Sequence, residues 1–60
     1  MFVQYEVWGI LDGHEELIEC FGTLKEAEAI VESNIDFLDE IYILEDRDDE
    51  LKEIRRYPGL

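Results

Sequence analysis

The dipeptide Asp12-Gly13, which lies between two apolar runs, constrains the fold of this chain more than any other feature. The first run, Phe2 to Leu11, is rich in aromatic and β-branched residues, and the second extends from Glu16 to Phe21. A type I′ turn needs positive φ at both of its central positions, and Asp-Gly tolerates that conformation. The sequence therefore predicts a β-hairpin in residues 2–21.

Alternation along these two predicted strands assigns their side chains to two faces. With a two-residue loop, the face expected to meet the helix holds Val3, Tyr5, Val7, Ile18 and Cys20. The other face holds the apolar residues Phe2, Trp8, Ile10, Leu17 and Phe21. This register sets Glu6 against Glu19, an unfavourable like-charge pair, so a four-residue loop with the same faces is the alternative. Cys20 is expected to be a small buried apolar residue.

The next segment has the start signal and the periodicity of a helix. Thr23 and Glu26 form a T-x-x-E capping box directly after Gly22. Apolar residues then recur at helical spacing, at Leu24, Ala27, Ile30 and Val31. Asn34 is expected to end the helix in the left-handed conformation, with Ile35 making the hydrophobic contact that follows such an end.

The C-terminal third predicts a central strand and a partner for it. Residues 40–45 (EIYILE) are apolar on both faces, which is typical of a strand buried on both sides. Residues 50–57 form either a short helix, since Leu51 and Ile54 are three apart, or a strand after a turn at Arg47-Asp48. We favour the hairpin because the turn residues are suitable and an apolar strand needs a neighbour. Its register would pair Leu51 with Leu44 and Ile54 with Ile41.

Together these elements predict an α+β fold in the order ββαβ(β), with a small, mostly antiparallel sheet and one helix on one face. We expect residues 1–60 to form a single acidic domain. A chain this short buries only roughly 60% of its unfolded surface, so its core is thin and an oligomer would help it to fold. The lone cysteine excludes an intramolecular disulfide, and no signal or membrane-spanning segment is recognisable. A cytoplasmic protein is therefore expected.

Charge restricts the partners of this chain. It has 17 acidic and 5 basic residues, for a formal net charge of −12. This exceeds the magnitude of about 2–8 that solubility alone requires of a small domain. Such a surface repels nucleic acid and anionic membranes, so we expect neither as a direct partner. A basic protein is the natural electrostatic complement.

Regular spacing of the carboxylates suggests how such a partner is held. Alternate strand residues lie about 6.6 Å apart and residues four apart on a helix about 6 Å apart, on the scale of successive phosphates in a nucleic-acid strand. We therefore expect an inhibitor that occupies the basic surface of a nuclease, helicase or polymerase as a DNA mimic, of the anti-defence type made by phages and mobile elements. The candidate acidic surface comprises Glu26, Glu28, Glu32, Asp36, Asp39, Glu40, Asp46, Asp48, Asp49 and Glu50.

The predicted apolar face supports a second interpretation, an assembly module that forms a homodimer. Exposed Trp and Phe side chains usually mark a partner site. That interface would comprise Phe2, Trp8, Ile10, Leu17 and Phe21, and acidity would then serve solubility only. Two internal explanations compete with it: the C-terminal segment, through Tyr57 and Leu60, folds over this face, or the helix covers it instead.

Motifs for catalysis and for metal binding are absent from the sequence. Asp46, Asp48 and Glu50 begin like a calcium loop, but its sixth and twelfth positions, which need Gly and Glu, hold Leu51 and Tyr57. Zinc spacing and a glycine-rich phosphate loop are also missing, and one His and one Cys on different elements make no nucleophile–base pair. We expect no enzymatic activity, no metal and no cofactor. Arg55 and Arg56 are expected to offset nearby carboxylates.

Overall fold

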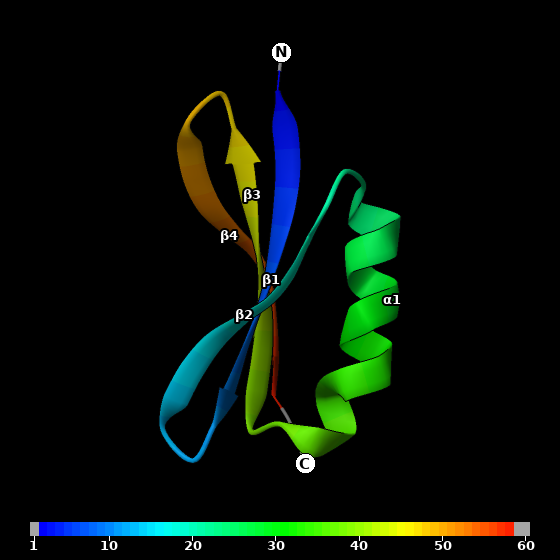
Figure 1. Cartoon of the computed structure of the whole chain (residues 1–60), viewed down its shortest axis with the longest axis vertical. Coiled ribbons are helices and arrows are strands. Elements are labelled where there is room, and N and C mark those ends of the chain that lie inside the picture. Colours follow the sequence, from blue (N-terminus) through cyan, green and yellow to red (C-terminus); the bar gives the residue numbers. More distant parts are fainter. Residues whose placement is uncertain (1, 59–60) are drawn as a thin grey trace.

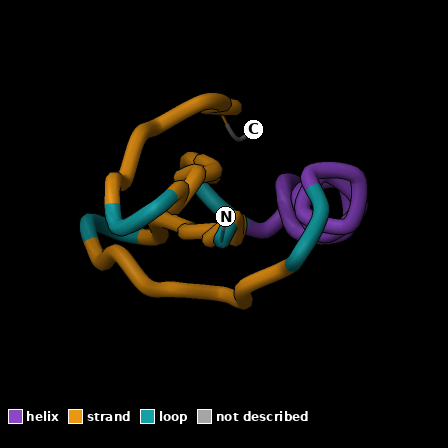
Figure 2. The backbone as a smooth tube through the Cα atoms, turned by 90° about the horizontal axis from the view of Figure 1, so that it is seen from above, coloured by secondary structure: helices purple, strands orange, loops and turns teal. Residues whose placement is uncertain are grey.

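The computed structural model describes residues 2–58, which form one antiparallel sheet with a helix on one side (Figures 1 and 2). The elements are β1 (Val3–Leu11), β2 (His14–Phe21), α1 (Leu24–Asn34), the 3-10 turn η1 (Ile35–Phe37), β3 (Glu40–Arg47) and β4 (Glu50–Pro58). The strand order is β2-β1-β3-β4. The predicted α+β fold is confirmed, and its ambiguous last segment is a strand. Within the described part of the chain, no helix has the length and apolar character needed to cross a membrane.

The β1–β2 hairpin has the predicted turn, and it keeps the register predicted for a two-residue loop as far as the Trp8–Leu17 pair. Leu11 pairs with His14, and Asp12 and Gly13 have φ of 52° and 80°, so the loop is the two-residue type I′ turn. Between Val7 and Trp8 the register then shifts, with Ile18 as the extra residue of a β-bulge.

This bulge changes which side chains face the helix. Beyond it, Glu6 pairs with Cys20 rather than with Glu19, and Tyr5 pairs with Phe21. The predicted like-charge pair is therefore avoided without a longer loop. Phe21 packs against the core, and Cys20 is exposed, so the predicted positions of both residues were wrong. The period-two alternation cannot reveal an inserted residue.

The β3–β4 hairpin also differs from its predicted register. Its turn is Asp48-Asp49, with φ of 50° and 70°, and a second register shift leaves Ile54 as the extra residue of β4. Leu51 therefore pairs with Asp46, and Ile41 pairs with Tyr57. Tyr57 packs on the helix side of the sheet, so the predicted alternative in which it covers the other face is wrong. Leu60, named in the same alternative, lies outside the described residues.

The helix begins as the sequence predicts and ends differently. The Thr23 Oγ1 accepts a hydrogen bond from the Glu26 backbone N–H (3.2 Å), and its hydroxyl donates to the Glu26 carboxylate (2.8 Å). Asn34 is not left-handed, since its φ is −117° and the chain continues into η1. Its side-chain amide instead donates to the Ile30 carbonyl (2.8 Å), which satisfies a carbonyl that the predicted cap would have served.

The core lies between the helix and the two central strands. Val7 of β1 and Ile41 and Ile43 of β3 are fully buried, and they pack with Ala27 and Val31 of α1. Half-buried apolar residues from β1, β2, α1, η1 and β4 surround this cluster. The prediction that β3 is buried on both faces is confirmed, because Tyr42, which points away from the helix, is also buried.

Candidate binding surface on the uncovered face of the sheet

The face of the sheet turned away from α1, here called the open face, is organised around one cross-strand row. Leu17, Trp8, Tyr42 and Arg56 are successive partners across β2, β1, β3 and β4. The Trp8 and Tyr42 rings are parallel within 5°, with centroids 6.4 Å apart. The Arg56 guanidinium carbon lies 4.6 Å from the centre of the Tyr42 ring. These neighbours leave Tyr42 only 6% exposed, although no helix covers it.

Carboxylates bind each polar group in this row. The Tyr42 hydroxyl donates to Glu15, which reaches it from β2 across β1, and the Trp8 indole N–H donates to Glu6 (3.0 Å). The Arg56 guanidinium forms ion pairs with Glu53 (2.7 Å) and Glu40 (3.0 Å). The row therefore consists of an aromatic pair and a cation. The four carboxylates that bind it, those of Glu6, Glu15, Glu40 and Glu53, are here called the frame.

This environment sets the protonation states of the row. Burial, and then the hydrogen bond and the charge of Glu15, raise the pKa of Tyr42 to about 12. The Glu53 and Glu40 carboxylates raise the pKa of Arg56, and the hydrogen bond from Arg56 lowers the pKa of Glu53. At neutral pH the phenol is therefore neutral, and the guanidinium and its carboxylate partner are charged.

The open face is negative overall. Its carboxylates are those of the frame, together with Asp46, which alternates with Tyr42 and Leu44 along β3. Five carboxylates (Glu6, Glu15, Glu40, Asp46 and Glu53) against one guanidinium give this face a formal charge of −4. Hydrogen bonds and ion pairs within the row hold the carboxylates of Glu6, Glu15, Glu40 and Glu53 in place.

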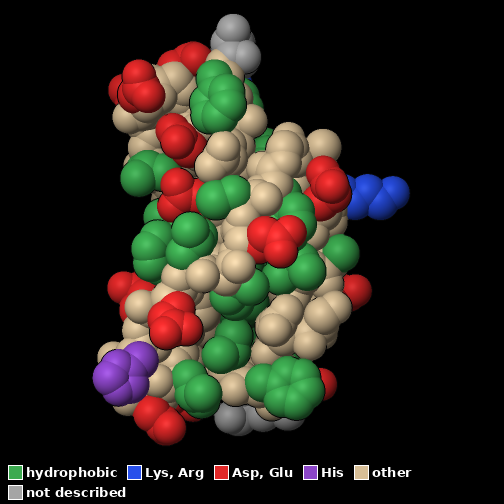
Figure 3. Space-filling view, viewed as in Figure 1, with side chains coloured by type: hydrophobic (Ala, Val, Ile, Leu, Met, Phe, Trp, Pro, Cys, Tyr) green, Lys and Arg blue, Asp and Glu red, His purple; other side chains and the backbone are tan. Residues whose placement is uncertain are grey.

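The ten acidic residues predicted from the sequence do not form one surface. Glu26, Glu28 and Glu32 lie on α1, Asp36 in η1, and Asp39 and Glu40 at the start of β3, whereas Asp46, Asp48, Asp49 and Glu50 surround the β3–β4 turn. The β3–β4 turn and the end of α1 are at opposite ends of a molecule 36 Å long (Figure 1). On the side seen in Figure 3, apolar and backbone atoms separate the acidic side chains. Only Glu40 and Asp46 of the ten belong to the open face.

The predicted apolar residues are placed more nearly as expected. Trp8, Ile10 and Leu17 lie on the open face, with Leu17 46% exposed, and Phe2, immediately before β1, is 58% exposed. Phe21 is the exception, because the β2 bulge turns it toward the core. Sequence reasoning missed the roles of Glu6, Glu15, Tyr42, Glu53 and Arg56. The alternation of Glu6 with Trp8 was a usable signal, whereas the Arg56 row depends on the bulge at Ile54.

Ion pairing leaves most of the negative charge exposed to partners. Among residues 2–58, which include all 17 carboxylates, four are in ion pairs: Glu28, Glu40, Glu45 and Glu53. Arg55 pairs with Glu28 of the helix at 3.8 Å, so both arginines offset carboxylates as predicted. In the same part of the chain, no three His, Cys, Asp or Glu side chains are grouped so that they could hold a metal ion.

Comparison of the chain with protein-family models, curated proteins and solved structures finds no match. Its function therefore has to be inferred from the chemistry of its own surfaces.

Proposed function

We propose that this protein is a small binding module that captures one basic protein on the open face of its sheet. The observation that carries the proposal is the frame of four carboxylates around the Trp8–Tyr42 pair and Arg56, on a face whose formal charge, with Asp46, is −4. A positively lined surface would be steered toward this face, and fixed charges need little reordering on contact. No catalytic step is assigned to the protein.

In its most specific form, the proposal is inhibition by charge mimicry. The carboxylates pair with the Lys and Arg side chains through which a nuclease, helicase or polymerase binds phosphates. Nucleic acid and this protein therefore compete for one groove. The aromatic pair supports this form, because a partner's Arg or Lys can pack on an indole ring as well as pair with the carboxylates. Such competition suits an anti-defence role in a phage or mobile element.

The same face favours a basic partner over a second copy of the chain. Two open faces brought together would each present a charge of −4, and like charges across an interface are unfavourable. Leu17 and Ile10 then form the apolar part of the contact with the partner. If the protein is instead an assembly module, it will be a dimer in solution, and Trp8→Ala will convert it to a monomer.

Charge reversal on matched faces tests the proposal. We would capture proteins from a lysate at low salt, elute with high salt, identify the retained basic protein and measure its affinity for variants. The open-face double variant Glu6→Lys, Asp46→Lys should bind at least tenfold more weakly, and nucleic acid should displace the wild-type protein. The control Glu32→Lys, Asp36→Lys makes the same charge change on α1 and η1 and should have a much smaller effect. Equal losses in the two double variants would refute the assignment to the open face.

A further inference from the structure

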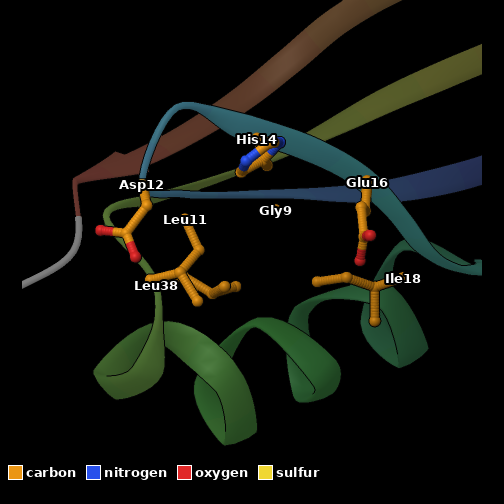
Figure 4. A pocket seen from close by; sticks show the side chains of 7 residues that line it. All are labelled: Gly9, Leu11, Asp12, His14, Glu16, Ile18 and Leu38. Carbon is orange, nitrogen blue, oxygen red and sulfur yellow. The ribbon is translucent and has the colours of Figure 1, made fainter.

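A pocket of about 300 Å³ opens on the helix side of the sheet, beneath the end of the β1–β2 hairpin (Figure 4). Its apolar lining comes from Gly9 and Leu11 of β1, Ile18 of β2, and Leu38, which precedes β3. Asp12 and Glu16 add carboxylates, and His14 completes the lining. The lining residues Leu11, Asp12, His14 and Glu16 are exposed, so the pocket is open to solvent. The hairpin turn lies at the same end of the molecule as the end of α1 and curves away from the helix (Figure 1).

Features of the backbone build this pocket. Gly9 has no side chain, and a Cβ there would lie 2.7 Å from Leu38 Cδ1 and 3.0 Å from Ile18 Cδ1, so Leu38 can approach the strand closely. Two hydrogen bonds hold the Leu38 segment against the hairpin. The Asp39 N–H donates to the Ile10 carbonyl (2.8 Å), and the Asp12 N–H donates to the Asp39 carboxylate (2.9 Å).

The bulge in β2 contributes a further part of the wall. Ile18 is its extra residue, and its side chain reaches the Gly9 position on the helix side of the sheet. Glu16, two residues earlier, pairs with Gly9 and lines the same pocket. An apolar wall and a carboxylate are therefore presented side by side on one strand.

The size and chemistry of the pocket indicate which kind of side chain it can bind. A volume of about 300 Å³ is at the lower end of the range for small-molecule sites, which suits a single long side chain. Lysine has a four-carbon stem that packs on apolar surface and a compact ammonium group that carboxylates can surround. Arginine can also pair with a carboxylate, but its planar guanidinium is wider than the compact ammonium group, so a pocket of this size favours lysine.

We propose that this pocket receives one lysine side chain of the basic partner, an inference that rests on the proposed function. The stem lies against Leu11 and Leu38, and the ammonium group lies beside the Glu16 carboxylate, which Figure 4 shows next to Ile18 and across the pocket from Asp12. Glu15 on the open face and Glu16 in the pocket are neighbours in β2. A partner groove that encloses the hairpin end therefore contacts both faces at once.

A small lysine probe tests the pocket directly. We would titrate the full chain with N-acetyl-lysine N-methylamide and follow backbone amide signals by NMR. The expected result is a saturable shift at Gly9, Ile18 and Leu38 that is absent with the Nζ-acetylated probe, which has the same stem without the charge. Equal shifts with both probes, or tighter binding of the corresponding arginine probe, would overturn the assignment of lysine.

Isosteric variants locate the charge that matters. Glu16→Gln should weaken binding of the probe about fivefold, the upper range for an exposed charge pair. Asp12→Asn should have a smaller effect, because Asp12 lies across the pocket from Glu16, and Asn tolerates the positive φ of the turn. Glu19→Gln is the matched control, because it removes the same charge from an exposed residue of β2 outside the pocket. If Glu16→Gln and Glu19→Gln have equal effects, the lysine does not occupy this pocket.

Failure of the pocket inference can be distinguished from failure of the proposed function. If Glu16→Gln captures the basic partner with unchanged affinity, the pocket inference is wrong and the open-face proposal stands. If the lysine probe binds in the pocket but no basic partner competes with nucleic acid, the proposed function is wrong.

Discussion

Trp8 and Tyr42 stack as parallel, offset rings on neighbouring strands, on a sheet face that no helix covers. Offset stacking of this kind contributes about 0.5–1.5 kcal/mol beyond the burial of the two rings. Arg56 covers the other side of Tyr42, and Glu15 binds its hydroxyl. The open face thus forms a small ordered layer of its own, which is why a sheet with a helix on one side has a buried tyrosine on the other.

Tyr42 should make stability depend on pH in the alkaline range. The folded protein holds the phenol proton up to about pH 12, whereas an unfolded tyrosine loses it near pH 10. The stabilising contribution is therefore complete below about pH 10 and is lost as the pH rises toward 12. We expect the free energy of unfolding to fall by roughly 1–2 kcal/mol over this range, less than the full shift because the face meets solvent.

Urea denaturation at a series of pH values would measure this loss. Tyr42→Phe should flatten the decrease between pH 10 and 12, and Tyr57→Phe is the control that removes a phenol from the other side of the sheet. An unchanged slope in Tyr42→Phe would contradict the role assigned to the hydrogen bond with Glu15.

The Asp48-Asp49 turn should be easy to stabilise. Both residues have positive φ, which is unfavourable for residues with a Cβ, and type I′ turns prefer Gly at the second position. Asp49→Gly should raise the free energy of unfolding by about 0.5–1 kcal/mol. Asp48 is best left in place, because it makes two hydrogen bonds to Phe2. In the other turn, Gly13→Ala should lower stability, and denaturation of both variants would show opposite signs.

Loss of the helix cap should be measurable. Thr23→Ala removes the side-chain oxygen that accepts the Glu26 N–H and should cost about 1 kcal/mol of stability. Thr23→Ser keeps the oxygen and should recover most of that stability. A Thr23→Ala protein as stable as the wild type in thermal and urea unfolding would mean that the cap contributes little.

Salt should stabilise this protein. A charge of −12 on 60 residues is self-repulsive, and salt screens such charges over about 8 Å at physiological ionic strength. We expect the melting temperature to rise between low and moderate sodium chloride, and to rise less in the neutralised variant Asp48→Asn, Asp49→Asn. A flat or falling curve for the wild type would mean that repulsion between surface carboxylates is weak.

Most of the fold was predictable from short local signals in the sequence. Asp12-Gly13 predicted the first turn and Thr23 with Glu26 predicted the start of the helix, because turns and caps depend on neighbouring residues. The registers were not predictable in the same way. Each hairpin contains an extra residue, Ile18 or Ile54, whose place is set by packing against the helix and the central strands. One inserted residue was enough to exchange Cys20 and Phe21 between faces.

The candidate binding surface was likewise predictable only in part. Net charge alone pointed to a basic partner, and alternation placed Trp8, Ile10 and Leu17 on the face away from the helix. Charge density along the sequence, however, drew attention to the β3–β4 turn, whereas the frame around Tyr42 takes one carboxylate from each strand. Carboxylates that come together from four different strands are far apart in the sequence, so they do not form an acidic run that sequence analysis could detect.

The pairing of β1 with β3 also has a consequence for biogenesis. Val7 pairs with Ile43, which is 36 residues later, so β1 is synthesised well before the strand that pairs with its inner edge. Until β3 has been synthesised, the nascent chain contains only the β1–β2 hairpin and α1, and the apolar residues of α1 lack the central strand against which they pack. The complete sheet is therefore expected to form only after β3 has been synthesised, and until then the unpaired edge of β1 is a surface that a chaperone could bind.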